Sequence, residues 1–157
     1  MTPLRFLADS TLGKLCKHLR MAGFDCRYDG RLPDGVRLRA LSRLEKRLVL
    51  TRAQRVAALL REESVVFVHD NDPDAQMRQV IHQLAIRRDA LRPLTRCLRC
   101  NEELTAIHQN ELTGRVPEYV LQHAVQFRIC PCCGRVYWPG SHARRMTDVL
   151  EQWFEAP

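Results

Sequence analysis

The first part of the chain alternates between short apolar runs and longer segments with helical periodicity. The strand candidates lie at residues 6–8, 24–28, 48–50 and 65–68. Those at 6–8, 48–50 and 65–68 are continuous apolar runs, which is typical of strands that are covered on both faces in a parallel sheet. Because a helical segment follows each run, the pattern predicts an α/β fold with helices on both faces of the sheet.

The segment after the first apolar run shows the clearest helical stripe. Its apolar positions recur at helical spacing and are Leu12, Leu15, Cys16, Leu19 and Ala22. Gly23 is expected to end this helix, and Ser10 or Thr11 to cap its start. Further helices are predicted up to about residue 47, over residues 54–62, and after residues 72–74.

The residues at the carboxyl ends of these strands are the first candidates for a functional site. Ligands of open parallel sheets bind beyond these ends. In this chain the residues there are Asp9, Asp29, Thr51, Arg52, His69 and Asp70.

Acidic residues lie at these strand ends and at the helix starts nearby. Grouped carboxylates could hold Mg²⁺ or Mn²⁺, and such an ion could assist hydrolysis of a phosphodiester bond. Asp9 is the strongest catalytic candidate because it directly follows the first strand and precedes a basic helix. The other candidates are Asp34, Asp70 and Asp72. An equally ordinary interpretation makes Asp34, Asp72 and Asp74 helix caps.

Positive charge is concentrated in the same part of the chain. Residues 1–96 contain 19 Lys and Arg against 11 Asp and Glu, whereas residues 97–157 contain 6 against 7. This balance favours a polyanionic partner, most simply nucleic acid, with solvated helix faces as the alternative. The candidate nucleic-acid contacts are Lys14, Lys17, Arg20, Arg52 and His142. Taken alone, His142 is more typical of a structural or exposed position.

Two CxxC pairs mark the C-terminal part of the chain. Cys97 and Cys100 form the first pair, and Cys130 and Cys133 form the second after 29 intervening residues. Four thiolates at this spacing suit a tetrahedral zinc ion, and a closed four-thiolate site is structural because it has no open coordination position. Cys132 lies inside the second pair and could replace Cys133 as a ligand.

The cysteine pairs also divide the chain. Pro93 precedes them, so we expect an α/β domain at residues 1–92 and a zinc-binding module at residues 93–157 that ends in a helix. Cys16 and Cys26 are expected in the core of the first domain. The cysteine usage and the absence of an apolar run near ~18 residues favour a cytoplasmic protein with no membrane partner.

Together these motifs resemble the Mut-seven C-terminal RNase family, in which a PIN-like nuclease domain is joined to a C-terminal zinc ribbon. The resemblance covers nearly the whole chain. It rests on residues 6–9, 12–15, 19–25 and 50–52, and most closely on the ribbon residues 96–101, 116–117, 130–138 and 140–142.

The resemblance implies a PIN-like parallel sheet, an acidic pocket that binds Mg²⁺ or Mn²⁺, and RNA as the substrate. Asp9 matches the family's first acidic position, and Asp34 lies near the second, where the family often has two adjacent acids. At the third position, after Leu-Thr-Arg, the family usually has Asp, whereas this chain has Ala53. Alanine cannot bind a metal or accept a proton, so Asp70 or Asp72 would have to complete the pocket.

Three functions remain open on this basis. The leading one is a metal-dependent ribonuclease, weakened by the alanine at residue 53. The alternative is a non-catalytic RNA-binding protein that acts in RNA processing or associates with tRNA or ribosomes. A toxin-like nuclease is the third, and the attached ribbon makes it less favoured.

Overall fold

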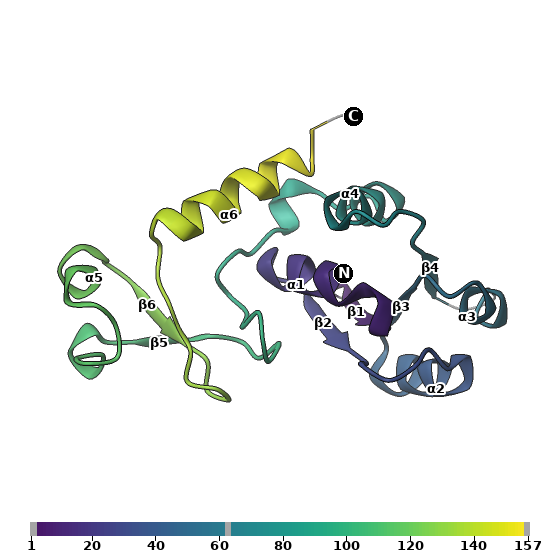
Figure 1. Ribbon diagram of the computed structural model, residues 1–157, viewed down its shortest axis with the longest axis horizontal. Coiled ribbons are helices and arrows are strands. Elements are labelled where there is room, and N and C mark those ends of the chain that lie inside the picture. Colours follow the sequence, from purple (N-terminus) through teal and green to yellow (C-terminus); the bar gives the residue numbers. More distant parts are fainter. Residues whose placement is uncertain (1–2, 62–63, 156–157) are drawn as a thin grey trace.

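Two sheets of different type divide the chain in the computed structural model, which describes residues 3–61 and 64–155. The first sheet is parallel, with the strand order β2-β1-β3-β4, and the second is antiparallel, with the order β5-β6-β7. In Figure 1, the parallel sheet and its helices lie on the right of the view, and the smaller sheet lies on the left. The predicted α/β class, with a parallel sheet flanked by helices and a small C-terminal ribbon, is therefore confirmed.

Strands and helices alternate along the first part of the chain, as the sequence pattern predicts. The strands are β1 (Arg5–Ala8), β2 (Asp25–Tyr28), β3 (Leu48–Thr51) and β4 (Val65–Phe67). The helices are α1 (Gly13–Met21), α2 (Gly35–Glu45), α3 (Gln54–Leu59) and α4 (Pro73–Gln83), with short 3-10 turns at η1 (Ser10–Leu12) and η2 (Arg88–Ala90). The third helix ends at Leu59, before the predicted end at Glu62, which lies outside the described residues.

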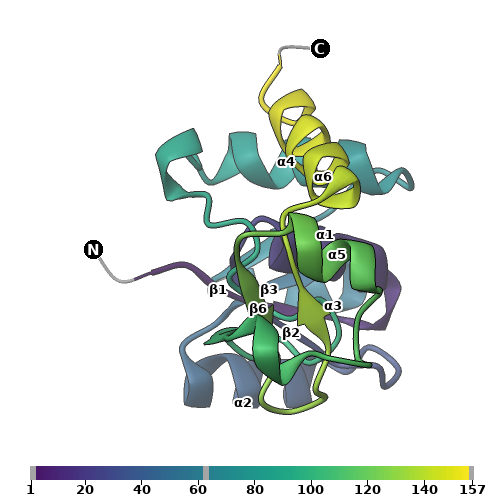
Figure 2. The same cartoon turned by 90° about the vertical axis from the view of Figure 1, so that its left-hand side faces the viewer.

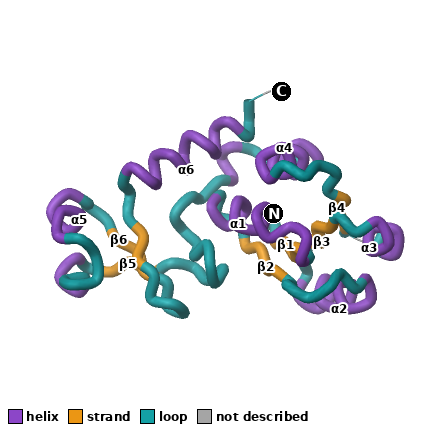
Figure 3. Tube along the Cα trace, viewed as in Figure 1, coloured by secondary structure: helices purple, strands orange, loops and turns teal. Residues whose placement is uncertain are grey.

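The parallel sheet is buried on both faces because successive side chains of each strand point in opposite directions. Phe6, Ala8 and Leu50 pack into one core with residues of α1 and α4. Leu7 and Val49 pack into a second core with residues of α2 and α3. The helix and strand layers are visible in Figure 3. As expected, Cys16 and Cys26 lie in the first core and are 1% and 0% exposed.

The ribbon module has a small core of its own. Its elements are β5 (Thr105–Ile107), η3 (Gln109–Glu111), α5 (Glu118–His123), β6 (Phe127–Ile129), β7 (Val136–Tyr137) and α6 (Ser141–Gln152). The buried residues of this core are Leu112, Val116, Val120 and Phe127. None of the described helices is both long and apolar enough to span a membrane.

The end of α6 returns to the parallel-sheet domain, as the second view of the molecule shows (Figure 2). Leu150 and Trp153 are buried in the same core as α1 and α4. The indole Nε1 of Trp153 donates a hydrogen bond to Oδ1 of Asp74 at 2.8 Å, and the ring lies 4.8 Å from that of His18. The ribbon is thus joined to the sheet domain at its start, by the continuous chain, and at its end, by α6. The expected domain division between residues 92 and 93 stays a prediction.

Candidate functional site

A cavity of about 940 Å³ lies across the carboxyl ends of all four parallel strands. Its lining includes one residue at or just beyond each strand end, namely Thr11, Tyr28, Arg52 and Asn71. Residues of α1 form another part of the wall, and two loops of the ribbon complete it. The cavity therefore lies where parallel sheets ordinarily bind ligands.

The lining of this cavity is strongly basic. Six lining residues are Lys or Arg, and no Asp or Glu of the described residues is among them. The six are Lys14, Lys17, Arg20, Arg52, Arg99 and Arg135. A concave surface lined by charge of one sign concentrates the field and attracts polyanions. Four of the six were predicted from the sequence, whereas the ribbon residues Arg99 and Arg135 were not.

Most of these cations have no paired counter-charge in the part of the chain that the structure describes. Across residues 3–61 and 64–155, no hydrogen bond or ion pair involves the side chains of Lys14, Lys17, Arg52, Arg99 or Arg135. The Nε atom of Arg52 is even buried without a hydrogen-bond partner. Other arginines are paired, as Arg47 is with Asp25, so the lining of this cavity is available to an external anion.

Arg20 differs from the other cations of the lining. It is only 8% exposed, and its guanidinium group binds backbone carbonyls. Nε donates to the carbonyl of Cys26 at 2.9 Å, and Nη1 donates to those of Leu98 and Arg99 at 3.0 and 2.9 Å. Arg20 thus holds the ribbon against the sheet domain. His142, the fifth predicted nucleic-acid contact, is exposed in the first turn of α6 and does not line the cavity.

Asp9 is buried directly after β1 and is 1% exposed. Its Oδ1 atom accepts a hydrogen bond from the amide of Thr11 at 2.9 Å and another from the Thr11 hydroxyl, and its Oδ2 atom accepts one from the hydroxyl of Thr51. The expectation that Ser10 or Thr11 caps this helical segment was wrong. Asp9 is the N-cap of η1, because its carboxylate reaches the free amide two residues later.

The other predicted acids form local caps and turns. Asp34 caps α2 and accepts hydrogen bonds from the amides of Val36 and Arg37, at 3.0 and 3.4 Å. Asp72 caps α4 through the amide of Ala75, at 2.9 Å. The carboxylate of Asp70 accepts a hydrogen bond from the amide of Asp72 at 2.8 Å. These contacts agree with the alternative interpretation of Asp34 and Asp72 as helix caps.

The residues around Asp9 do not form a complete site for Mg²⁺ or Mn²⁺. Within the described part of the chain, the only group of three or more Asp, Glu, His or Cys ligand atoms that lie close together is formed by four cysteines. Ala53 has no carboxylate, and its amide donates to the hydroxyl of Thr51 at 3.0 Å. Hard divalent cations need several oxygen ligands, which this arrangement does not bring together.

The four predicted cysteine ligands form that group. The Sγ atoms of Cys97, Cys100, Cys130 and Cys133 all lie within 4.8 Å of one another. A tetrahedral ion with Zn–S bonds of about 2.3 Å separates its sulfurs by about 3.8 Å, and Cys97 and Cys133 are 3.7 Å apart. The cluster could therefore bind a metal such as zinc. Cys132 is exposed and is not part of the group.

The surroundings of Cys97 favour its thiolate form, which is the form that binds metals. Burial raises the pKa of Cys97, but hydrogen bonds from the Tyr137 hydroxyl and from the amides of Cys100 and Arg99 lower it to about 6. The Tyr137 hydroxyl lies 3.2 Å from the Cys97 sulfur and also accepts a hydrogen bond from the amide of Leu98.

Comparison with protein families gives a match to the Mut7-C RNase domain over residues 4–150. The chain belongs to the Mut7-C RNase family. The match covers nearly the whole chain, includes both sheets, and confirms the resemblance seen in the motifs. A search of curated proteins and a search of solved structures gave no match. The family description points to a nuclease or to another RNA-related role.

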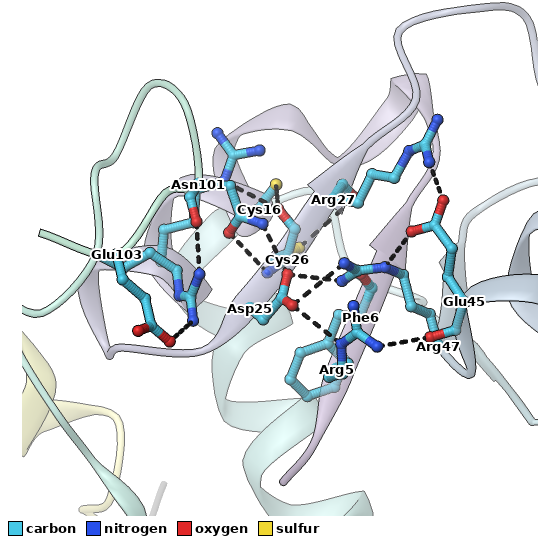
Figure 4. A network of polar contacts seen from close by, with 12 residues as sticks. Arg5, Phe6, Cys16, Asp25, Cys26, Arg27, Glu45, Arg47, Asn101 and Glu103 are labelled. Atoms are coloured by element: carbon cyan, nitrogen blue, oxygen red, sulfur yellow. Dashed lines mark hydrogen bonds and ion pairs between the residues drawn. The ribbon is translucent and has the colours of Figure 1, made fainter. Parts of the chain in front are cut away.

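In this Mut7-C chain, a polar network joins the first cysteine pair to the start of β2 (Figure 4). Asp25 is at its centre and accepts hydrogen bonds from Arg47 at 2.6 and 3.2 Å, from Arg5 at 3.0 Å and from the side chain of Asn101 at 2.7 Å. Oδ1 of Asn101 also accepts from the amide of Cys26 at 2.9 Å. Sequence reasoning missed this network, because its members are far apart in the chain.

Proposed function

We propose that this Mut7-C chain binds RNA along the basic cavity at the carboxyl edge of its parallel sheet. The observation that carries the proposal is the convergence of five cations on the ligand-binding edge of the sheet, where none of them is paired with a described residue and no described acid lines the cavity. Phosphate groups repeat along an RNA strand and accept hydrogen bonds from Lys and Arg regardless of sequence. Such binding is sequence-independent and sensitive to salt.

The test is RNA binding at increasing salt by fluorescence anisotropy. We expect the wild type to bind labelled RNA at low salt, with log K falling linearly with log salt by about 0.7 for each phosphate contact on a single strand. The double substitution Lys14→Ala and Lys17→Ala should reduce this slope by about 1.4. Substitution of Arg55 and Arg61, which are exposed outside the cavity, is the matched control and should leave the slope unchanged. No binding by the wild type at low salt would refute the proposal.

A second candidate function is metal-dependent hydrolysis of the bound RNA. The family match and the position of Asp9 at the end of β1 favour it, whereas Ala53 and the absence of a cluster of three carboxylates among the described residues favour weak activity. The test is incubation of labelled RNA with Mn²⁺ or Mg²⁺ and wild type, Asp9→Asn or the exposed control Asp89→Asn. Cleavage that only Asp9→Asn loses supports hydrolysis at Asp9. Equal cleavage by all three proteins would exclude Asp9, and binding without turnover would leave the binding function alone.

We also propose that the cysteine cluster holds one structural zinc ion. The arrangement of its four sulfurs supports this proposal, because they leave no position for a substrate. Elemental analysis should give about one zinc per chain, and Cys97→Ser should abolish it. A folded ribbon without metal would contradict this assignment.

A further inference from the structure

Each cysteine pair brings one arginine into the basic cavity. Arg99 lies between Cys97 and Cys100, and Arg135 follows Cys133 by two residues. Both arginines line the cavity, are exposed, and have no hydrogen bond or ion pair from their side chains to any described residue. The C-terminal part of the chain carries no net positive charge. The positive charge that it adds to the cavity therefore comes from the position of these two side chains and not from the net charge of the module.

The first cysteine pair is attached to the sheet domain by the protein itself. Arg20 donates hydrogen bonds to the carbonyls of Leu98 and Arg99, at 3.0 and 2.9 Å. Asn101 binds both the Asp25 side chain and the amide of Cys26 in β2. These contacts hold the backbone of Arg99 beside α1 without any help from a metal.

The second cysteine pair lacks such an attachment. Leaving Arg39 and Arg43 of α2 aside, no hydrogen bond or ion pair of the described residues links residues 130–135 to residues 3–92. Its hydrogen bonds stay within the ribbon, where Nη2 of Arg115 donates to the carbonyl of Gly134 at 3.1 Å and β7 pairs with β6. Its links to the first pair are the pairing of β6 with β5, the shared burial of Cys97, Leu104 and Cys130, the sulfur cluster and the hydroxyl of Tyr137.

From this asymmetry we infer that the ribbon is part of the RNA site, and that metal bound by the four cysteines sets RNA affinity by holding Arg135 beside Arg99 and α1. Arg99 and Arg135 bind phosphates of the RNA strand whose other contacts are Lys14, Lys17 and Arg52. The metal touches no RNA, but a tetrahedral ion fixes the second pair to the first and thus to the cavity. The inference rests on the proposed RNA binding at the same cavity.

The test is a comparison of salt slopes for oligouridine binding with and without metal. For the zinc-loaded protein, the double substitution Arg99→Ala and Arg135→Ala should weaken binding several-fold at low salt and reduce the slope by about 1.4. Removal of zinc from the wild type should also reduce the affinity and the slope. In the double variant, removal of zinc should have little further effect, because the charge that the metal positions is already gone.

The control is the double substitution Arg144→Ala and Arg145→Ala, which removes the same charge from exposed positions of α6 outside the cavity. Its slope and its loss of affinity on zinc removal should equal those of the wild type. If the wild type binds oligouridine and neither Arg99, Arg135 nor the metal changes the slope, the inference is wrong while the proposed function stands. If the zinc-loaded wild type does not bind, the proposed function itself fails.

Discussion

Tyr28 shows how single residues add to the chemistry of the cavity. The residue ends β2, lines the cavity and is 42% exposed. Its hydroxyl donates a hydrogen bond to the carbonyl of Ser10 at 3.2 Å. Gly13 and Gly30 lie against its ring, and a Cβ atom at residue 30 would lie 3.3 Å from a ring carbon. A held aromatic ring beside unpaired cations is typical of sites that stack the bases of single-stranded nucleic acid.

Replacement of this ring should therefore weaken binding of single-stranded RNA. We expect Tyr28→Ala to cost about 1–3 kcal/mol of binding free energy, which is the usual value of one stacked base. Tyr28→Phe keeps the ring and should bind almost as tightly as the wild type. The measurement is the dissociation constant for oligouridine, with thermal unfolding as a check on the fold. Equal losses in Tyr28→Ala and Tyr28→Phe would show that the hydroxyl and not the ring is needed.

Residues of the site could be predicted from the sequence where they lie near one strand end. Lys14 and Lys17 follow β1 and Arg52 follows β3, so the parallel sheet brings them together. Arg99 and Arg135 could not be predicted in this way. Their position depends on how the ribbon packs on α1. The C-terminal part also has no net positive charge that would indicate a basic surface.

At the scale of elements, the contact between β2 and the first cysteine pair depends on one carboxylate. Asp25 is only 19% exposed on its side chain, and four hydrogen bonds from three side chains reach it. Burial raises the pKa of Asp25, but the hydrogen bonds from Arg47, Asn101 and Arg5 lower it to about 2. The charged form is therefore favoured in the folded protein relative to the unfolded chain, where the value is about 3.9.

The lowered pKa of Asp25 predicts how the stability of the protein changes in acid. Because the folded-state pKa of Asp25 is lowered, its stabilisation is present above about pH 4 and is lost as the pH falls towards 2. Asp25→Asn should lower the free energy of unfolding by about 2 kcal/mol at pH 7, and the difference from wild type should shrink to near zero below about pH 2.

Urea unfolding of both proteins at several pH values measures this difference. Asp89→Asn, whose side chain is 69% exposed, is the control and should show no comparable trend. A difference between Asp25→Asn and the wild type that stays constant with pH would mean that the carboxylate charge is not what stabilises the contact.

The elements of the parallel sheet were predictable, and most of those of the ribbon were not. Continuous apolar runs such as Leu48–Leu50 are long enough to indicate a buried strand. The ribbon strands have two or three residues each, and two of the three positions of β5 are exposed. A module organised by a metal, as proposed for this ribbon, needs little apolar burial, so its strands would leave a weak pattern in the sequence.

At the scale of the whole molecule, α6 complicates the expected division at residues 92 and 93. The helix follows the ribbon in sequence, yet Leu150 and Trp153 are buried against the sheet domain. Figure 1 shows it extending from the ribbon towards α4. The sequence predicted a helix at the end of the module but could not show which domain it covers, because an apolar helix face does not specify its partner.

The two tryptophans of the chain allow the two cores to be followed separately during metal removal. Trp138 packs in the ribbon core near Phe127, whereas Trp153 lies in the core of the sheet domain.

We expect chelation of zinc from Trp153→Phe, which retains only Trp138, to give the emission of an unfolded ribbon, because small zinc modules gain about 10–16 kcal/mol from their metal. Chelation from Trp138→Phe should leave the Trp153 emission native until urea is added, because its contacts with His18 and Asp74 do not involve the cysteines. Added zinc should restore the Trp138 signal. If both signals instead change together on chelation, the ribbon and the sheet unfold as one cooperative unit and the division at residues 92 and 93 does not describe how this chain folds.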